Sequence, residues 1–82
     1  MAQKHEVIIY STPSCVYCRL AKEYFKENRV QYKEIDVAAD QKKAEEMIEK
    51  SGQLGVPVIE IDDQIIVGFD KPKIQHLLGL PN

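Results

Sequence analysis

The sequence of 82 residues contains no tryptophan, only two cysteines and only a small excess of negative charge. Its 11 basic and 13 acidic residues give a formal net charge of −2, so the basic surface typical of proteins that bind nucleic acids or anionic membranes is missing. We therefore expect neither a nucleic acid nor a membrane as a partner.

Long hydrophobic runs are also missing. After Met1–Glu6 the first apolar run covers only Val7–Tyr10, which is too short for the core of a signal peptide or for a membrane span. The sequence therefore predicts a cytoplasmic protein. Its composition, 44% hydrophobic and 29% charged, is ordinary for a globular protein, and its length allows a single domain over residues 1–82, which we expect to be a monomer.

The two cysteines, Cys15 and Cys18, are too close in sequence for a disulfide between them to stabilise the fold much, because it would close a very short loop. In a compartment that keeps thiols reduced, such a pair is typical of a cycling dithiol or of half a metal site. Neither His5 nor His76 stands at a finger-like spacing from the pair, and a second Cys-x-x-Cys is absent. We therefore favour redox chemistry over zinc and assign the two histidines no role.

Hydrophobic periodicity and turn residues divide the chain into seven predicted elements, with Asp40 and Asp70 as N-caps of the second and third helices. In chain order they are a strand over 6–10, a helix over 15–28, a strand over 30–37, a helix over 41–51, strands over 58–61 and 64–67, and a helix after residue 70. This order predicts an α/β fold with a mixed sheet, because strand–helix–strand units are parallel and the short turn at 62–63 is antiparallel. We expect the charges of the second helix, including Glu46 and Lys50, to form a solvated face.

The cysteine pair falls at the start of the first helix, for which the hydroxyls of Ser11, Thr12 and Ser14 are N-cap candidates. Cys15 would lie where the helix dipole favours a thiolate, and Cys18 one turn deeper, on the apolar stripe of the helix. We therefore predict that Cys15 is the nucleophile and that Cys18 resolves the mixed disulfide.

Three motifs, Tyr10–Cys18, Gly55–Val58 and Val67–Asp70, resemble the glutaredoxin family over essentially the whole chain. The resemblance implies a glutaredoxin-like thioredoxin fold: a four-stranded mixed sheet of order 2-1-3-4 flanked by three helices, with a cis peptide before Pro57. It also implies a dithiol–disulfide oxidoreductase that reduces protein or glutathionyl mixed disulfides. No cofactor is expected beyond the Cys15–Cys18 disulfide, with glutathione as a possible electron donor.

The same resemblance implies a substrate groove beside the cysteines. The free backbone of Val56 would pair with an extended substrate next to Pro57, and Gly68 would allow close approach of its backbone. Phe69 would line the groove or pack as a core aromatic. The remaining substrate-binding residues that we expect are Tyr17, Gln53 and Asp70.

The chain departs from glutathione-dependent members at two positions. Thr12 stands where these usually carry a basic residue, and Lys71 stands where they carry an acid. With Val16 in the cysteine motif, the chain looks like the NrdH-redoxin branch, which takes electrons from a flavoprotein thioredoxin reductase and passes them to ribonucleotide reductase. The donor therefore stays open between glutathione and that reductase.

Two further classes of function compete with disulfide reduction. In the first, Cys15, glutathione and a second subunit would bridge an iron–sulfur cluster, as in some glutaredoxins. In the second, the chain would be a non-catalytic adaptor, and the intact cysteine pair argues against it.

Overall fold

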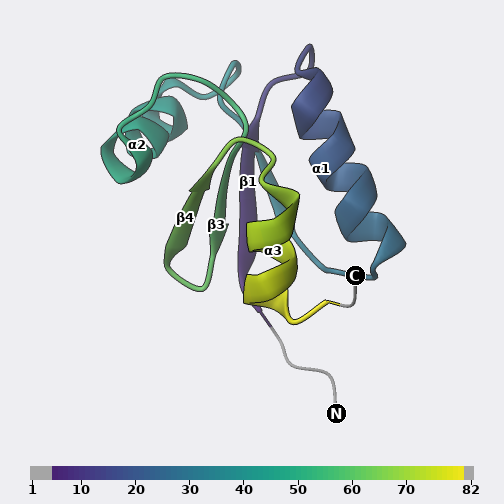
Figure 1. The fold of residues 1–82 in the computed structure, drawn as a ribbon. Coiled ribbons are helices and arrows are strands. Elements are labelled where there is room, and N and C mark those ends of the chain that lie inside the picture. The colour runs from purple at the N-terminus through teal and green to yellow at the C-terminus, as the bar shows by residue number, and fades with distance from the viewer. Residues whose placement is uncertain (1–4, 81–82) are drawn as a thin grey trace.

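The computed structural model describes residues 5–80 (Figure 1). Residues 1–4, which precede the apolar run considered above as a targeting segment, and residues 81–82 lie outside that range. The elements are β1 (Val7–Ser11), α1 (Val16–Glu27), β2 (Lys33–Asp36), α2 (Gln41–Ser51), β3 (Val58–Ile61), β4 (Gln64–Val67) and α3 (Lys71–Leu78). Within residues 5–80, no helix has the length and apolar character needed to cross a membrane.

The elements follow the predicted order, but β2 is shorter than the predicted strand. Arg29 adopts a left-handed conformation with φ 57°, and the N–H of Val30 donates to the carbonyl of Phe25 at 2.8 Å. Val30 is therefore used to close the end of α1, and the strand starts only at Lys33. The predicted caps of the other two helices are confirmed, since Asp40 and Asp70 accept hydrogen bonds at the N-termini of α2 and α3.

The four strands form one mixed sheet of order β2-β1-β3-β4, as the thioredoxin fold predicts. β1 is parallel to β2 and antiparallel to β3, and β4 is antiparallel to β3. The register places Tyr10 opposite Val58, and Val58 opposite Val67. The end of β1, the start of β3 and the end of β4 therefore lie side by side, so the β1–α1, α2–β3 and β4–α3 loops meet at one edge of the sheet, across the strand ends (Figure 1).

Helices cover both faces of the sheet (Figure 1). α1 and α3 pack on one face and α2 on the other, so β1 alternates between two cores, with Ile9 facing the first and Tyr10 the second. Both side chains are fully buried, which confirms the prediction of a central strand buried on both faces. The first core contains Val7, Ile9, Ala21, Tyr24, Phe25, Ile59, Ile61, Ile66, Ile74 and Leu78, and the second contains Tyr10, Met47 and Val58.

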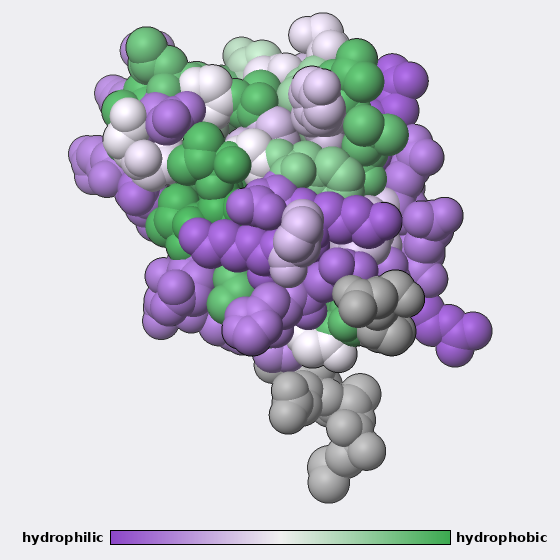
Figure 2. Space-filling model, viewed as in Figure 1, coloured by the Kyte–Doolittle hydropathy of each residue, from purple (hydrophilic) through white to green (hydrophobic). Residues whose placement is uncertain are grey.

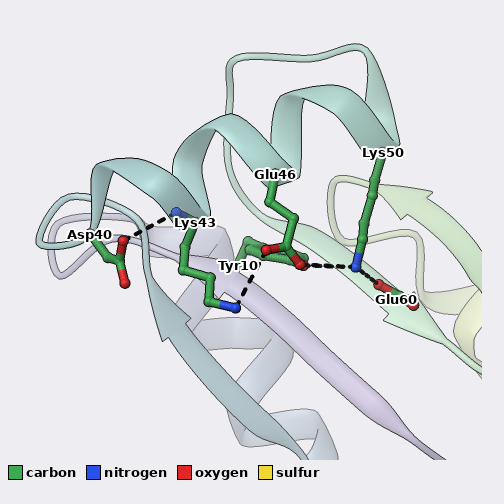
Figure 3. A network of polar contacts seen from close by, with 6 residues as sticks. All are labelled: Tyr10, Asp40, Lys43, Glu46, Lys50 and Glu60. Carbon is green, nitrogen blue, oxygen red and sulfur yellow. Dashed lines mark hydrogen bonds and ion pairs between the residues drawn. The ribbon is translucent and has the colours of Figure 1, made fainter.

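The charged side of α2 is more than a solvated face, which corrects the prediction from the sequence. Lys50 Nζ lies 3.3 Å from a carboxylate oxygen of Glu46 and 2.8 Å from one of Glu60 on β3 (Figure 3). Lys50 also donates to the hydroxyl of the buried Tyr10 at 3.2 Å, and that hydroxyl donates to Glu46 at 3.4 Å. These contacts, Glu60 first, raise the pKa of Lys50 and tie α2 to the two central strands.

Candidate active site

The cysteine pair occupies the loop edge of the sheet, at the start of α1. Cys15 is the N-cap residue of α1, with extended backbone angles of φ −84° and ψ 116°, and its Sγ accepts a hydrogen bond from the N–H of Cys18 at 3.1 Å. The prediction that a serine or threonine hydroxyl caps this helix is therefore wrong. The backbone N–H of Cys15 donates to the carbonyl of Thr12 at 3.3 Å, and this turn carries the thiol into the cap position.

The cap position has a chemical consequence for Cys15. Its sulfur lies where the first N–H groups of the helix have no carbonyl partner within the helix and where the helix dipole is positive. Cys15 is also partly exposed, so a substrate can reach it. The same contact that begins the helix therefore brings a backbone N–H to the accessible sulfur.

Cys18 has the opposite environment. It is fully buried on the inner side of α1, on the same side of the helix as the buried Ala21. Burial, followed by its hydrogen bond with Cys15, raises the pKa of Cys18 to about 12. Both thiols are free, and they differ in access: the Cys15 sulfur is partly exposed, whereas the Cys18 sulfur is buried.

The loop before β3 lies at the same edge of the sheet. The Val56–Pro57 peptide bond is cis, as the family resemblance implies. The carbonyl of Pro57 accepts the N–H of Gly68 at 2.8 Å, and Gly68 has a φ of 79°, a conformation that glycine adopts readily. Within residues 5–80 the backbone of Val56 makes no hydrogen bond, so its N–H and C=O are available to a ligand.

The other predicted substrate-binding residues differ from one another in burial and in their contacts. Phe69 packs as a core aromatic, with its ring centroid 5.9 Å from that of Tyr24, and it is half-buried. Asp70 uses one carboxylate oxygen to cap α3, where it accepts from Lys73 N–H at 3.4 Å. Gln53 and Tyr17 are exposed, and the backbone N–H of Gln53 donates to the Ser51 hydroxyl at 3.1 Å.

Exposed apolar side chains gather on the elements that carry the cysteine pair and its neighbouring loops. Figure 2 shows this hydrophobic surface in green toward the upper part of the molecule, where α1 begins, with hydrophilic surface below it. Leu54, at 82% exposure, precedes the cis peptide, and Val67 ends β4. Among residues 5–80, the large exposed apolar residues are Val16, Tyr17, Leu20, Leu54 and Val67.

The two histidines lie away from the cysteine pair. His5 precedes β1 and contacts the carboxylate of Asp62 in the β3–β4 turn, at the sheet edge opposite the loops. His76 is exposed on α3. In the part of the chain that the structure describes, no three His, Cys, Asp or Glu side chains form a cluster that could hold a metal ion.

One polar cluster near the cysteine pair was not predicted. The buried hydroxyl of Ser11 and the ammonium group of Lys22 both donate to Glu34 Oε2, at 2.9 and 2.7 Å. The only signal in the sequence is the spacing of four residues between Cys18 and Lys22, which puts them on one face of a helix. Glu34 could not have been placed, because its approach depends on the parallel pairing of β1 with β2.

Comparison with known proteins identifies the family. A family model described as Glutaredoxin matches residues 7–66, a range that contains both cysteines and the cis peptide. The chain belongs to the glutaredoxin family. Members of this family are thiol–disulfide oxidoreductases, so the chain is a glutaredoxin-like redox protein whose Cys-x-x-Cys pair is Cys15 and Cys18.

Relatives and a solved structure agree with this family. A protein of Clostridium pasteurianum, described as an uncharacterized glutaredoxin-like 8.6 kDa protein in the rubredoxin operon, is 50% identical over 70 residues, 85% of this chain and 93% of that protein. Glutaredoxin 3 of Escherichia coli (strain K12) is 41% identical over 64 residues, 78% of this chain and 77% of that protein. The glutaredoxin-like protein NrdH-redoxin from Escherichia coli superposes with a TM-score of 0.81 at 25% identity, over 93% of this glutaredoxin-family chain and 99% of that one.

Proposed function

We propose that this glutaredoxin-family protein reduces protein disulfides or glutathionyl mixed disulfides, with Cys15 as the nucleophile and Cys18 as the resolving thiol. The observation that carries the proposal is the asymmetry of the pair. Cys15 Sγ accepts the Cys18 N–H at 3.1 Å and is accessible, whereas the Cys18 thiol is fully buried and held protonated. A substrate can therefore meet one sulfur first.

The reaction moves two electrons from the dithiol to the substrate. The Cys15 thiolate attacks one sulfur of the substrate disulfide, forms a mixed disulfide and releases the other substrate sulfur as a thiolate. Cys18 then loses its proton and attacks Cys15 Sγ, so the Cys15–Cys18 bond forms while the bond to the substrate breaks. The second substrate sulfur leaves with the electron pair and takes up a proton. The redox cofactor is thus the protein's own dithiol.

Substrate binding follows from the unpaired backbone beside the cysteines. An extended segment of a substrate can pair with the free N–H and C=O of Val56, as an added strand does at a sheet edge. Pro57 and Gly68 are joined by a hydrogen bond of 2.8 Å, which fixes the backbone that follows Val56. We expect Tyr17, Gln53, Phe69 and Asp70 to line the same groove. Pairing through the main chain makes such binding tolerant of the substrate's side chains.

A second candidate concerns the electron donor: a flavoprotein thioredoxin reductase, with ribonucleotide reductase as the acceptor. Thr12 brings no charge to the site, and the Lys71 ammonium lies 5.3 Å from the ring centroid of Tyr24. Neither provides the charge that glutathione-dependent members usually use. The exposed apolar residues around the cysteine pair suit a protein partner better than a small charged peptide. The NrdH-redoxin of Escherichia coli, which is described as having a thioredoxin-like activity profile, points the same way.

The donor is tested with the oxidised protein and NADPH as the source of electrons. One reaction contains glutathione and glutathione reductase, and the other contains thioredoxin reductase; insulin serves as the protein disulfide in both. NADPH oxidation that depends on the protein in either reaction supports the dithiol function, and faster oxidation with thioredoxin reductase supports the second candidate. Thr12→Lys with Lys71→Asp is the matched variant, and we expect it to shift the preference toward glutathione by about tenfold. No oxidation in either reaction would contradict the proposed function.

A further inference from the structure

The polar cluster of Ser11, Lys22 and Glu34 joins three elements about one helical turn from Cys18. Ser11 ends β1, Glu34 lies on β2 and Lys22 lies on α1. A single carboxylate oxygen of Glu34 accepts both the Ser11 hydroxyl at 2.9 Å and the Lys22 ammonium at 2.7 Å. Glu34 therefore has a lowered pKa and Lys22 a raised one, each chiefly through their mutual hydrogen bond. The pair stays charged and the ammonium stays in place.

The position of Lys22 relates this cluster to the resolving cysteine. Lys22 follows Cys18 by four residues on α1, so the two side chains are neighbours on one helix face. Cys18 is fully buried, and the Lys22 side chain is only 25% exposed, so solvent screens the charge less than at an open surface. Glu34 on β2 binds the ammonium group, but the positive charge itself belongs to Lys22, which lies on the same helix as Cys18.

The environment of Cys18 changes during the reaction. In the reduced protein, burial raises its pKa most, and the hydrogen bond and the charge of Cys15 add to that rise. Once Cys15 is bonded to a substrate sulfur, it bears no negative charge, so both of its contributions are lost. Burial then remains, opposed by the backbone contact with Thr12 and by the positive charge of Lys22. Lys22 therefore has its largest relative influence in the mixed disulfide.

We propose that Lys22, held by Glu34 and Ser11, is a positioning residue for the resolving step, in which its ammonium group favours the thiolate form of Cys18. This inference rests on the proposed function, because it requires Cys18 to be the resolving thiol. In the step itself, the Cys18 thiol gives its proton to solvent and its thiolate attacks Cys15 Sγ. The Cys15–Cys18 bond forms, the bond from Cys15 to the substrate breaks, and the departing substrate thiolate takes up a proton. Lys22 keeps its own proton throughout.

Few other charged or titratable groups reach this cluster in the described part of the chain. On α1, Lys26 acts on Glu34 from one further turn along, and Cys15 faces Cys18 directly. From the segment before β2, the Tyr32 hydroxyl acts on Lys22. Lys26 is exposed and carries the same charge as Lys22 at a greater distance from Cys18. It therefore provides the matched control.

An aromatic disulfide, dithiobis-nitrobenzoate, separates the two half-reactions of the full chain. Cys15 attacks it and releases one coloured thionitrobenzoate, and Cys18 then releases the second. In Lys22→Gln we expect the second release near about pH 7 to be about three- to tenfold slower and its pH midpoint to rise by roughly half to one unit. The first release should stay within about twofold of the wild-type rate. Lys22→Arg should restore the second release, because it returns the charge.

Three results would overturn the inference. They are a wild-type pH profile for the second release in Lys22→Gln, an equal slowing in Lys26→Gln, and a failure of Lys22→Arg to restore the rate. The Cys18→Ser variant distinguishes this inference from the function on which it rests. If Cys18→Ser still releases the second thionitrobenzoate, the resolving role of Cys18 is contradicted. If Cys18→Ser loses the second release but Lys22→Gln keeps the wild-type rate, only the role of Lys22 is contradicted.

Discussion

Replacing Cys15 by serine should abolish disulfide reduction, to less than about one thousandth of the wild-type rate. A serine hydroxyl at the cap can still accept the N–H of residue 18, so α1 should form and the loss should be purely chemical. The remaining Cys18 is buried and protonated and cannot meet a substrate disulfide. The measurement is the turnover of insulin disulfides by each variant, with circular dichroism to confirm the fold.

Cys18→Ser is the matched variant for this prediction, because it removes the other sulfur of the same pair. Attack by Cys15 should survive, so this variant should accumulate mixed disulfides with its substrates, seen as a mass increase that a reducing agent reverses. Substantial turnover by Cys15→Ser, or mixed disulfides formed through Cys18, would show that the two thiols have the opposite roles.

The second large effect that we expect is on stability: Phe25→Ala should lower the free energy of unfolding by about 3–5 kcal/mol. The Phe25 ring is fully buried in the core between α1 and the sheet, and its centroid lies 5.4 Å from that of Tyr32 and 6.4 Å from that of Tyr24. Its removal leaves a cavity that a small core fills poorly, and the cost is a large fraction of the stability usual for one domain. Urea unfolding followed by circular dichroism measures the change.

The control for Phe25→Ala is Leu54→Ala, which truncates an apolar side chain that is 82% exposed rather than buried. We expect its free energy of unfolding to stay within about 0.5 kcal/mol of the wild-type value. Equal destabilisation by the two substitutions would be incompatible with the core as described.

Much of the fold could be predicted from local sequence signals, because those signals act over a few residues. The apolar run of β1 indicated a strand buried on both faces, and Asp40 and Asp70 marked the helix starts. The contacts across the sheet could not be predicted in this way. Lys50 and Glu60 are ten residues apart on different elements, so no spacing rule connects them, and the buried Tyr10 hydroxyl that joins their network lies on a third element.

In the functional site too, features set by nearby residues could be predicted, whereas features set by contacts between distant elements could not. The roles of Cys15 and Cys18 followed from spacing and from the helix start, but the cap formed by Cys15 itself did not, since serine and threonine are the usual caps. The partnership of Glu34 with Lys22 depends on a parallel pairing of strands that only the folded chain establishes. The cis peptide before Pro57 was expected from family resemblance alone, because most X–Pro bonds are trans.

Brief alkylation of the reduced protein with iodoacetamide at about neutral pH tests the central claim, the chemical asymmetry of the two thiols, most directly. Fragment-ion mass spectrometry then locates the modified sulfur within the peptide that contains both cysteines. We predict a single adduct on Cys15, because Cys18 is buried and its pKa is raised to about 12. Modification of Cys18 first, or of both thiols at the same rate, would contradict this asymmetry.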